Sequence, residues 1–230
     1  MIPVRPLLLA CSVVLVSVLA LSGCGGSALA SRQYYLVDVT RPGAPAAAPV
    51  PGDVLLQVPP FEVDRAFATK SLVYRVEASR YEPDFYRQFL VSPGVMMMEE
   101  TRDWLASSGL FTQVFSADTR LEATHILEGN ITDLYADFTT PAAPQAVLEI
   151  RFFLQAQTGT PARGLLTRTY RAVSPIGERT AEAVVEAFSR TLAEILSRVE
   201  ADLQKVLAAG SSPPDTRTER PSDGKTVGQS

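Results

Sequence analysis

Two stretches of this chain alternate apolar and polar side chains, residues 72–79 and 146–156. A period of two is typical of strands with one buried face. Each stretch has a neighbour that would complete an antiparallel hairpin: residues 85–90 after a turn at 81–84, and residues 165–173 after a loop that contains glycine and proline. The chain is therefore expected to form a sheet that covers a core with one face.

Two further segments show helical periodicity. Residues 180–207 place apolar side chains three or four apart, which predicts a helix about 42 Å long that lies across the sheet or offers its far end to a partner. A shorter helix begins at Ser92-Pro93, where Ser92 can act as the N-cap, and ends before Gly109. Helices beside a half-buried sheet indicate an α+β fold.

Within the shorter helix stands the triplet Met96-Met97-Met98. Only one or two of three consecutive helical side chains can face inward, so we expect core packing with partial exposure. Shorter extended segments are expected at 34–37, 54–58 and 112–115, and a longer one at 124–138. Gly129 lies in the middle of the longer one, which indicates a bulge or a close neighbour.

The chain opens with an apolar run from Leu7 to Leu21, preceded by Arg5. As a helix this run would reach only about 22 Å, which is short of the roughly 30 Å hydrocarbon core of a bilayer. An apolar run of this length followed by small residues is typical of a secretory signal. Residues 1–23 are therefore interpreted as a signal peptide.

Leu21-Ser22-Gly23-Cys24 resembles the bacterial lipobox. In that motif the cysteine sulfur receives a diacylglyceryl group and the new amino terminus is acylated, while the residues before it are recognised by the signal peptidase. Leu21, Ser22 and Gly23 are the predicted recognition residues, and Cys24 is the predicted attachment site. The alternative is an ordinary signal peptide with an incidental cysteine. Gly25 is not an aspartate, and in enteric bacteria this favours transport to the outer membrane.

The chain has two cysteines, Cys11 and Cys24, and both lie in this leader region. The remaining sequence therefore has no disulfide and must be stabilised by its core alone. The net charge is −4, and no concentrated basic stretch is present. This composition argues against a nucleic-acid partner and against electrostatic adhesion to anionic lipids.

Residues 24–33 are interpreted as a lipidated lead and residues 34–207 as one domain. This domain includes a connector rich in proline and alanine at 41–53. The tail at 208–230 has almost no apolar content and is expected to be disordered.

No motif in the sequence predicts catalysis. The single histidine, His125, has no cysteine or second histidine near it, so neither a zinc site nor a catalytic role is expected. Glu99 and Glu100 are adjacent in the predicted helix and diverge by about 100°, which prevents them from acting as a pair. We expect no catalytic residue, no metal and no cofactor other than the lipid on Cys24.

The order of these features is similar to that of the ABC-type transport auxiliary lipoproteins, the family that includes paraquat-inducible protein C. The features are the lipobox, then Tyr34-Tyr35-Leu36, the 54–59 segment with Phe61, and Leu72-Val73-Tyr74-Arg75. They continue with the helix that carries Trp104, the 109–114 segment, the 127–131 strand and the long closing helix. The resemblance implies a single two-layer α+β domain in which two helices pack on a mostly antiparallel sheet.

The resemblance also implies a non-enzymatic subunit that acts beside an ABC permease and an MCE-domain protein, which move lipids or other lipophilic compounds between two membranes. The subunit would be attached to the periplasmic face of the outer membrane through its lipid. A homo-oligomer and a monomer are both left as alternatives for its assembly state. An exposed sheet edge or the end of the 180–207 helix would contact the partner. The alternatives are a periplasmic lipid-binding chaperone, which needs a large apolar cavity, and a lipoprotein that activates outer-membrane assembly or a cell-wall enzyme.

Overall fold

The computed structural model describes residues 31–45, 53–157 and 162–210. The predicted leader with Cys24, part of the connector, and residues 211–230 of the tail lie outside these residues. The expected start of a disordered tail at residue 208 was wrong, because the closing helix continues to Gly210. The described elements, in chain order, are β1 (Gln33–Tyr35), β2 (Leu55–Val58), β3 (Glu62–Val63), β4 (Ser71–Glu77), β5 (Arg80–Phe89), α2 (Pro93–Ser108), β6 (Gln113–Ser116), β7 (His125–Asp137), β8 (Gln145–Ala156), β9 (Arg163–Pro175) and α3 (Ala181–Gly210).

The described strands form one mixed sheet around β7, which is paired along both edges. On one edge β7 pairs with β8 in antiparallel register, and β8 pairs with β9 in the same way. On the other edge β2, β3 and β4 follow one another along β7, all parallel to it. The chain from β2 to β4 therefore acts as one interrupted strand.

The remaining strands extend the sheet beyond this interrupted edge. Strand β5 pairs with β4 in antiparallel register, β1 adds to β5 in parallel, and β6 adds to β2 in parallel. The long ladders are antiparallel and the parallel pairings are short. The predicted α+β fold with a mostly antiparallel sheet is thus confirmed, with short parallel pairings that make the sheet mixed.

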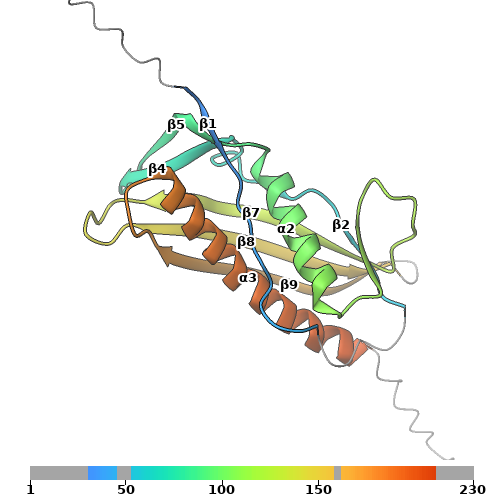
Figure 1. Cartoon of the computed structure of the whole chain (residues 1–230). Coiled ribbons are helices and arrows are strands. Elements are labelled where there is room, and N and C mark those ends of the chain that lie inside the picture. Colours follow the sequence, from blue (N-terminus) through green and yellow to red (C-terminus); the bar gives the residue numbers. More distant parts are fainter. Residues whose placement is uncertain (1–30, 46–52, 158–161, 211–230) are drawn as a thin grey trace, which may run out of the picture. The chain divides into compact units, whose positions relative to one another are not determined.

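Helices α2 and α3 lie on the same face of the sheet, as Figure 1 shows. Between them and the sheet lies the main core, which α3 lines with Phe188, Leu192, Ile195 and Val199, all at most 1% exposed. Burial of a large apolar side chain contributes about 1.5–3 kcal/mol. The stripe of α3 stays buried as far as Leu207, so its far end packs against the domain rather than offering apolar side chains to a partner.

The opposite face of the sheet carries a smaller aromatic cluster. Phe67, from the segment between β3 and β4, stacks on Tyr135 with ring centroids 5.9 Å apart, and Tyr81 meets Tyr135 edge to face at 5.4 Å. The Arg75 guanidinium lies 5.9 Å from the centroids of the Tyr81 and Tyr135 rings. Val147, which pairs with Tyr135 in the sheet, is 2% exposed, so part of the helix-free face is also packed.

The expected turn at 81–84 was wrong. The hairpin turns at residues 78 and 79, and β5 already begins at Arg80. Tyr81 is held in the strand by its contact with Tyr135, and Arg80 forms an ion pair with Glu77 across the turn. Pro83 is tolerated because it lies beside an irregularity in the register between β4 and β5.

The start of α2 differs from the expectation in two details. Ser92 occupies the N-cap position with extended backbone, but its side chain makes no capping bond. The triplet Met96-Met97-Met98 is buried throughout, at 2%, 0% and 5% exposure, so the expected partial exposure was wrong. Residues after β1 run alongside α2, and the Val37 N–H donates to Met96 Sδ at 3.3 Å. The end of α2 is as expected, since Gly109 adopts φ 75°.

Gly129 has the close neighbour that its position in the sequence indicated. A Cβ built on Gly129 would lie 2.7 Å from atoms of the Phe61 ring, which packs edge-on against Phe152 with centroids 5.5 Å apart. The register shift in β7 lies further along, between Ile131 and Asp133. The glycine is therefore explained by the approach of Phe61.

Within the described residues, no helix has an apolar stretch long enough to cross a membrane.

Replacing Gly129 with alanine is expected to destabilise the domain by about 1–3 kcal/mol, because the new methyl group displaces the Phe61 ring from a packed core. The measurement is the free energy of unfolding from denaturant titration. Gly177→Ala is the control, since a Cβ there meets no atom within 4 Å, and it should change stability by less than about 0.5 kcal/mol. Equal effects of the two variants would contradict this explanation of Gly129.

Candidate functional site: a strap between the two helices

The segment that follows β1 crosses the helical layer. Residues 36–45, which we call the strap, pass between α2 and α3 (Figure 1). Three consecutive strap amides donate in alternation to side chains of the two helices: Val37 to Met96 Sδ of α2 at 3.3 Å, Asp38 to Ser189 Oγ of α3 at 3.2 Å, and Val39 to Glu100 Oε2 of α2 at 2.9 Å. The strap therefore joins the helices along its length.

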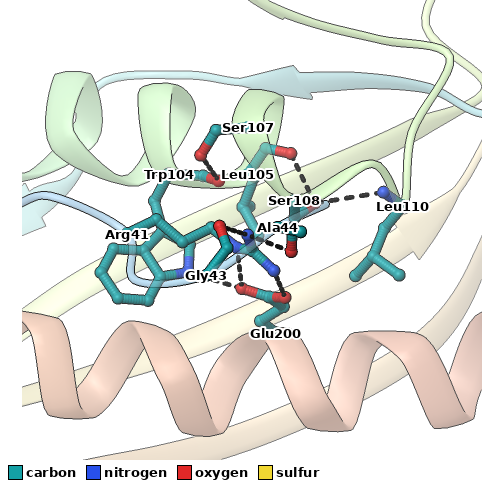
Figure 2. Close-up of polar contacts among 9 residues, drawn as sticks. All are labelled: Arg41, Gly43, Ala44, Trp104, Leu105, Ser107, Ser108, Leu110 and Glu200. Carbon is teal, nitrogen blue, oxygen red and sulfur yellow. Dashed lines mark hydrogen bonds and ion pairs between the residues drawn. The ribbon is translucent and has the colours of Figure 1, made fainter. Parts of the chain in front are cut away.

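Glu200 of α3 fastens the far end of the strap, as Figure 2 shows. Its carboxylate accepts hydrogen bonds from Arg41 Nε at 2.9 Å and Arg41 Nη2 at 2.7 Å, and from Trp104 Nε1 of α2 at 2.7 Å. The side chains of Arg41 and Glu200 are only 11% and 17% exposed. We call Arg41, Trp104 and Glu200 the clamp, because one carboxylate holds the strap and both helices.

Electrostatics and local turns support this geometry. The hydrogen bond to Glu200 raises the pKa of Arg41 above its ordinary value, so the guanidinium stays charged. Arg41 Nη1 also donates to the carbonyls of Gly43 and Ala44, which folds the strap back around the side chain. Bidentate contact between guanidinium and carboxylate is strong and directional. The clamp therefore fixes the position of the strap relative to both helices.

The end of α2 is fixed next to the clamp (Figure 2). Ser107 Oγ donates to the Trp104 carbonyl at 2.8 Å, and Ser108 Oγ donates to the Leu105 carbonyl at 2.6 Å while accepting from the Leu110 N–H at 3.2 Å. These bonds satisfy groups that a helix end leaves without partners. Trp104 is thus held on a well-defined last turn.

Leu21, Ser22, Gly23 and Cys24 lie outside the described residues, so lipid attachment remains a prediction. Arg41 falls within the segment expected to be a loose connector, yet it is one of the better anchored side chains of the strap. Sequence reasoning missed the clamp. Trp104 is the only tryptophan, which is a weak signal, but nothing in the sequence relates Arg41 to a glutamate 159 positions later.

An exposed sheet edge was one candidate contact surface, and at the β9 edge α3 covers part of the strand. Arg198 Nη1 donates to the Arg171 carbonyl at 2.9 Å, and Arg190 Nη2 donates to the Pro175 carbonyl at 2.8 Å. Arginine side chains thus occupy carbonyls that a further strand would need. An edge blunted in this way resists pairing with another chain.

The far end of α3 was the other candidate contact surface. Asp202 ties this end to β9 by accepting from Arg168 at 2.6 Å and from the Tyr170 hydroxyl at 2.9 Å. Burial and the bond to Asp202 raise the pKa of Tyr170, so its hydroxyl remains a donor. The buried side of this end therefore has its partner within the domain.

A cleft of about 290 Å³ lies beside the start of α3, between the β4–β5 hairpin and Phe138. Tyr74, Val76 and Val184 form its apolar part, and Arg87 is among its polar lining. This volume is at the small end of the range for ligand sites. It does not provide the large apolar cavity that a carrier of two-chain lipids requires.

His125 is partly buried at the start of β7. Its Nδ1 lies 2.9 Å from Thr124 Oγ1, and burial lowers the pKa of its imidazole. In residues 31–45, 53–157 and 162–210 no group of three or more histidine, cysteine, aspartate or glutamate side chains could hold a metal ion.

Comparison with known families gives one match. A family model described as the ABC-type transport auxiliary lipoprotein component matches residues 34–200. Comparison with curated protein sequences finds no match.

Solved structures share the fold at low sequence identity. Protein XCC0632 from Xanthomonas campestris has a TM-score of 0.68 and 16% identity, over 78% of this chain and 98% of that one. A second structure, described as an uncharacterized protein, has a TM-score of 0.59 and 13% identity, over 75% of this chain and 99% of that one. These similarities show the fold.

Glu200→Gln is expected to destabilise the chain by about 2 kcal/mol, because a neutral amide cannot replace a carboxylate that accepts charged hydrogen bonds from Arg41. Hydrogen exchange should accelerate at the amides of the strap. Glu194→Gln is the matched control on the same helix, since its ion pair with Arg198 at 3.7 Å is exposed and contributes less than about 0.5 kcal/mol. Unchanged strap protection in Glu200→Gln would contradict the clamp.

The position of Glu100 beneath the strap predicts that the stability of the folded chain depends on pH. Burial raises the pKa of its carboxyl, although the Val39 N–H favours the charged form. The folded chain therefore binds a proton more readily than the unfolded chain, and the stability contributed by Glu100 falls as pH rises through the raised pKa.

Glu100→Gln keeps an acceptor for Val39 and removes this titration. Its stability relative to the wild type should be higher at about pH 7 than at about pH 4. The measurement is the free energy of unfolding at both pH values, with the exposed Glu99→Gln as control. A stability difference that does not change with pH would contradict the prediction.

Proposed function

The chain belongs to the ABC-type transport auxiliary lipoprotein family, and from this premise we propose that it is a non-enzymatic subunit that docks an intermembrane transport assembly at the outer membrane. The family description makes it an auxiliary component of transport. Its cargo would be lipids or other lipophilic compounds. ATP hydrolysis would take place in a separate cytoplasmic protein.

The proposed attachment is a diacylglyceryl group and an N-acyl chain on Cys24, after cleavage behind Gly23. One acyl chain binds a bilayer only marginally, whereas several chains hold a protein firmly. The lipid would place the domain on the periplasmic face of the outer membrane. An MCE-domain protein is the proposed partner, and a homo-oligomer remains part of the proposal.

The observation that carries this proposal is the strap. A flexible tether would let the domain take any orientation above the membrane. Here the segment that follows the proposed anchor is held between both helices and fastened by Glu200. A domain whose amino-terminal segment is built into its helical layer keeps its partner surface at a fixed place relative to the end of the tether.

The packing does not favour a lipid carrier. The space between the sheet and the two helices is filled by side chains such as Leu127, Phe152 and Leu196, all fully buried. Three clefts along the described residues lie at the surface, with volumes of about 290–430 Å³. A chaperone with two-chain cargo would need a deeper apolar cavity.

Cys24→Ser is expected to abolish lipid attachment, and with it resistance to detergents and lipophilic toxins, while the domain still folds. The measurements are the intact mass of protein from cells, partition into membranes, and survival on detergent. Cys11→Ser is the matched control, because this cysteine leaves with the signal peptide and its loss should change nothing. Normal resistance in Cys24→Ser would contradict docking through the lipid.

Co-purification from cross-linked cells tests the partner. Recovery of an MCE-domain protein with the wild-type chain, and its loss with Cys24→Ser, is the expected result. Recovery of an outer-membrane β-barrel or a peptidoglycan synthase instead would support the assembly or activation role and contradict the transport role.

A further inference from the structure

The exposed large apolar side chains are concentrated at one corner of the sheet. Among the described residues, five of them come from β1 and the end of β5 or directly follow these strands: Tyr34 at 52% exposure, Leu36 at 51%, Phe85 at 60%, Tyr86 at 46% and Leu90 at 49%. We call these five residues the corner patch. Leu121, at 44%, belongs to the loop before β7 and is not part of it.

The register places Tyr34 on the face away from the helices. Tyr35 pairs with Phe89 and accepts from the Leu90 N–H at 2.9 Å. The Tyr35 hydroxyl donates to Glu182 of α3, and Phe89 packs against α3, so both side chains point toward the helices. Side chains alternate along a strand. Tyr34 therefore lies on the opposite, helix-free face, while Leu36 and Leu90, which directly follow the two strands, are exposed close to it.

Phe85 and Tyr86 reach the surface through an irregularity in β5. The pairing with β4 passes from Val73–Pro83 to Ser71–Gln88, which leaves residues 84–87 outside the ladder. The Asp84 carboxylate accepts from the Tyr86 N–H at 2.9 Å and from the Arg87 N–H at 3.0 Å. Phe85 and Tyr86 then meet edge to face at 5.2 Å. The protruding aromatic pair is thus held by a defined turn.

The length of chain between the proposed anchor at Cys24 and the patch indicates that the membrane surface covers the patch. Nine residues lie between Cys24 and Tyr34, and even when fully extended the ten steps from one to the other span at most about 35 Å. The patch therefore begins where a tether from the membrane would end. Tyrosine and phenylalanine side chains suit the boundary between headgroups and hydrocarbon, because each tyrosine has an apolar ring and a polar tip.

One cation borders the patch and agrees with this location. Lys70 Nζ donates to the Leu90 carbonyl at 2.9 Å. A lysine head at the rim of an apolar surface can remain among lipid headgroups.

We propose that the corner patch inserts into the interfacial region of the bilayer that holds the lipid on Cys24. This rests on the lipid anchor of the proposed function and adds a second, reversible contact that sets the orientation of the domain. Two weak membrane signals combine into stable attachment more effectively than either alone. With the patch in the interface, the helical layer faces away from the membrane, toward the space in which a partner approaches.

The test uses lipidated protein purified from cells and reconstituted into vesicles of phosphatidylethanolamine and phosphatidylglycerol. The lipidated chain has no free thiol, since Cys11 is removed and Cys24 is modified. Leu90→Cys can therefore be labelled alone with an environment-sensitive fluorophore. Leu121→Cys is the matched control, a leucine of similar exposure outside the patch.

Doxyl-labelled lipids are expected to quench the probe at position 90 several-fold more than the probe at position 121. In Leu90→Cys protein that also carries Tyr34→Ser and Tyr86→Ser, quenching should fall to the control level while the intact mass still shows the lipid. Equal quenching at both positions of lipidated protein would overturn the patch and leave the anchor standing. Quenching that requires an added transport partner would also overturn it, in favour of a protein-covered patch. An unmodified Cys24 would overturn both proposals.

Discussion

The arrangement of this domain depends most on the hydrogen bonds that the Glu200 carboxylate accepts. This carboxylate accepts hydrogen bonds from Arg41 and from Trp104, which lie 159 and 96 positions earlier in the chain. The strap, α2 and α3 would otherwise meet mainly through apolar contacts, which are not directional. Because charged hydrogen bonds fix distance and angle, one side chain sets the place of the strap within the helical layer.

The sheet has one face covered by helices and another that is covered only in part. On the second face Phe67, Tyr81 and Tyr135 form a local cluster over β4, β7 and β8, while the corner beside β1 keeps its apolar side chains exposed. An exposed apolar patch of this kind marks a contact surface. Its place at the amino-terminal end of the domain relates the surface to the proposed anchor, and the strap relates the same end of the chain to the helices.

Charged side chains of α3 cover the outer edge of β9 and hinder another chain from pairing with it. Arg190 and Arg198 cover carbonyls on the outer edge of β9, and Asp202 ties the last turns of the helix to the same strand. These contacts are partly exposed, and each contributes little to stability. Their effect is on specificity, because they occupy hydrogen-bonding groups that would otherwise recruit another strand.

The sequence by itself determined the α+β class, the helices and most strand positions, because periods of two and of 3.6 are local properties of the chain. It also indicated the close neighbour of Gly129. The tertiary structure decided the parallel pairings along β7, the burial of all three methionines, the turn before β5 and the clamp. Each of these depends on which distant segments meet, such as Met96 under the strap or Tyr81 on Tyr135. Local periodicity cannot encode such meetings, since they follow from how all the elements pack together around one core.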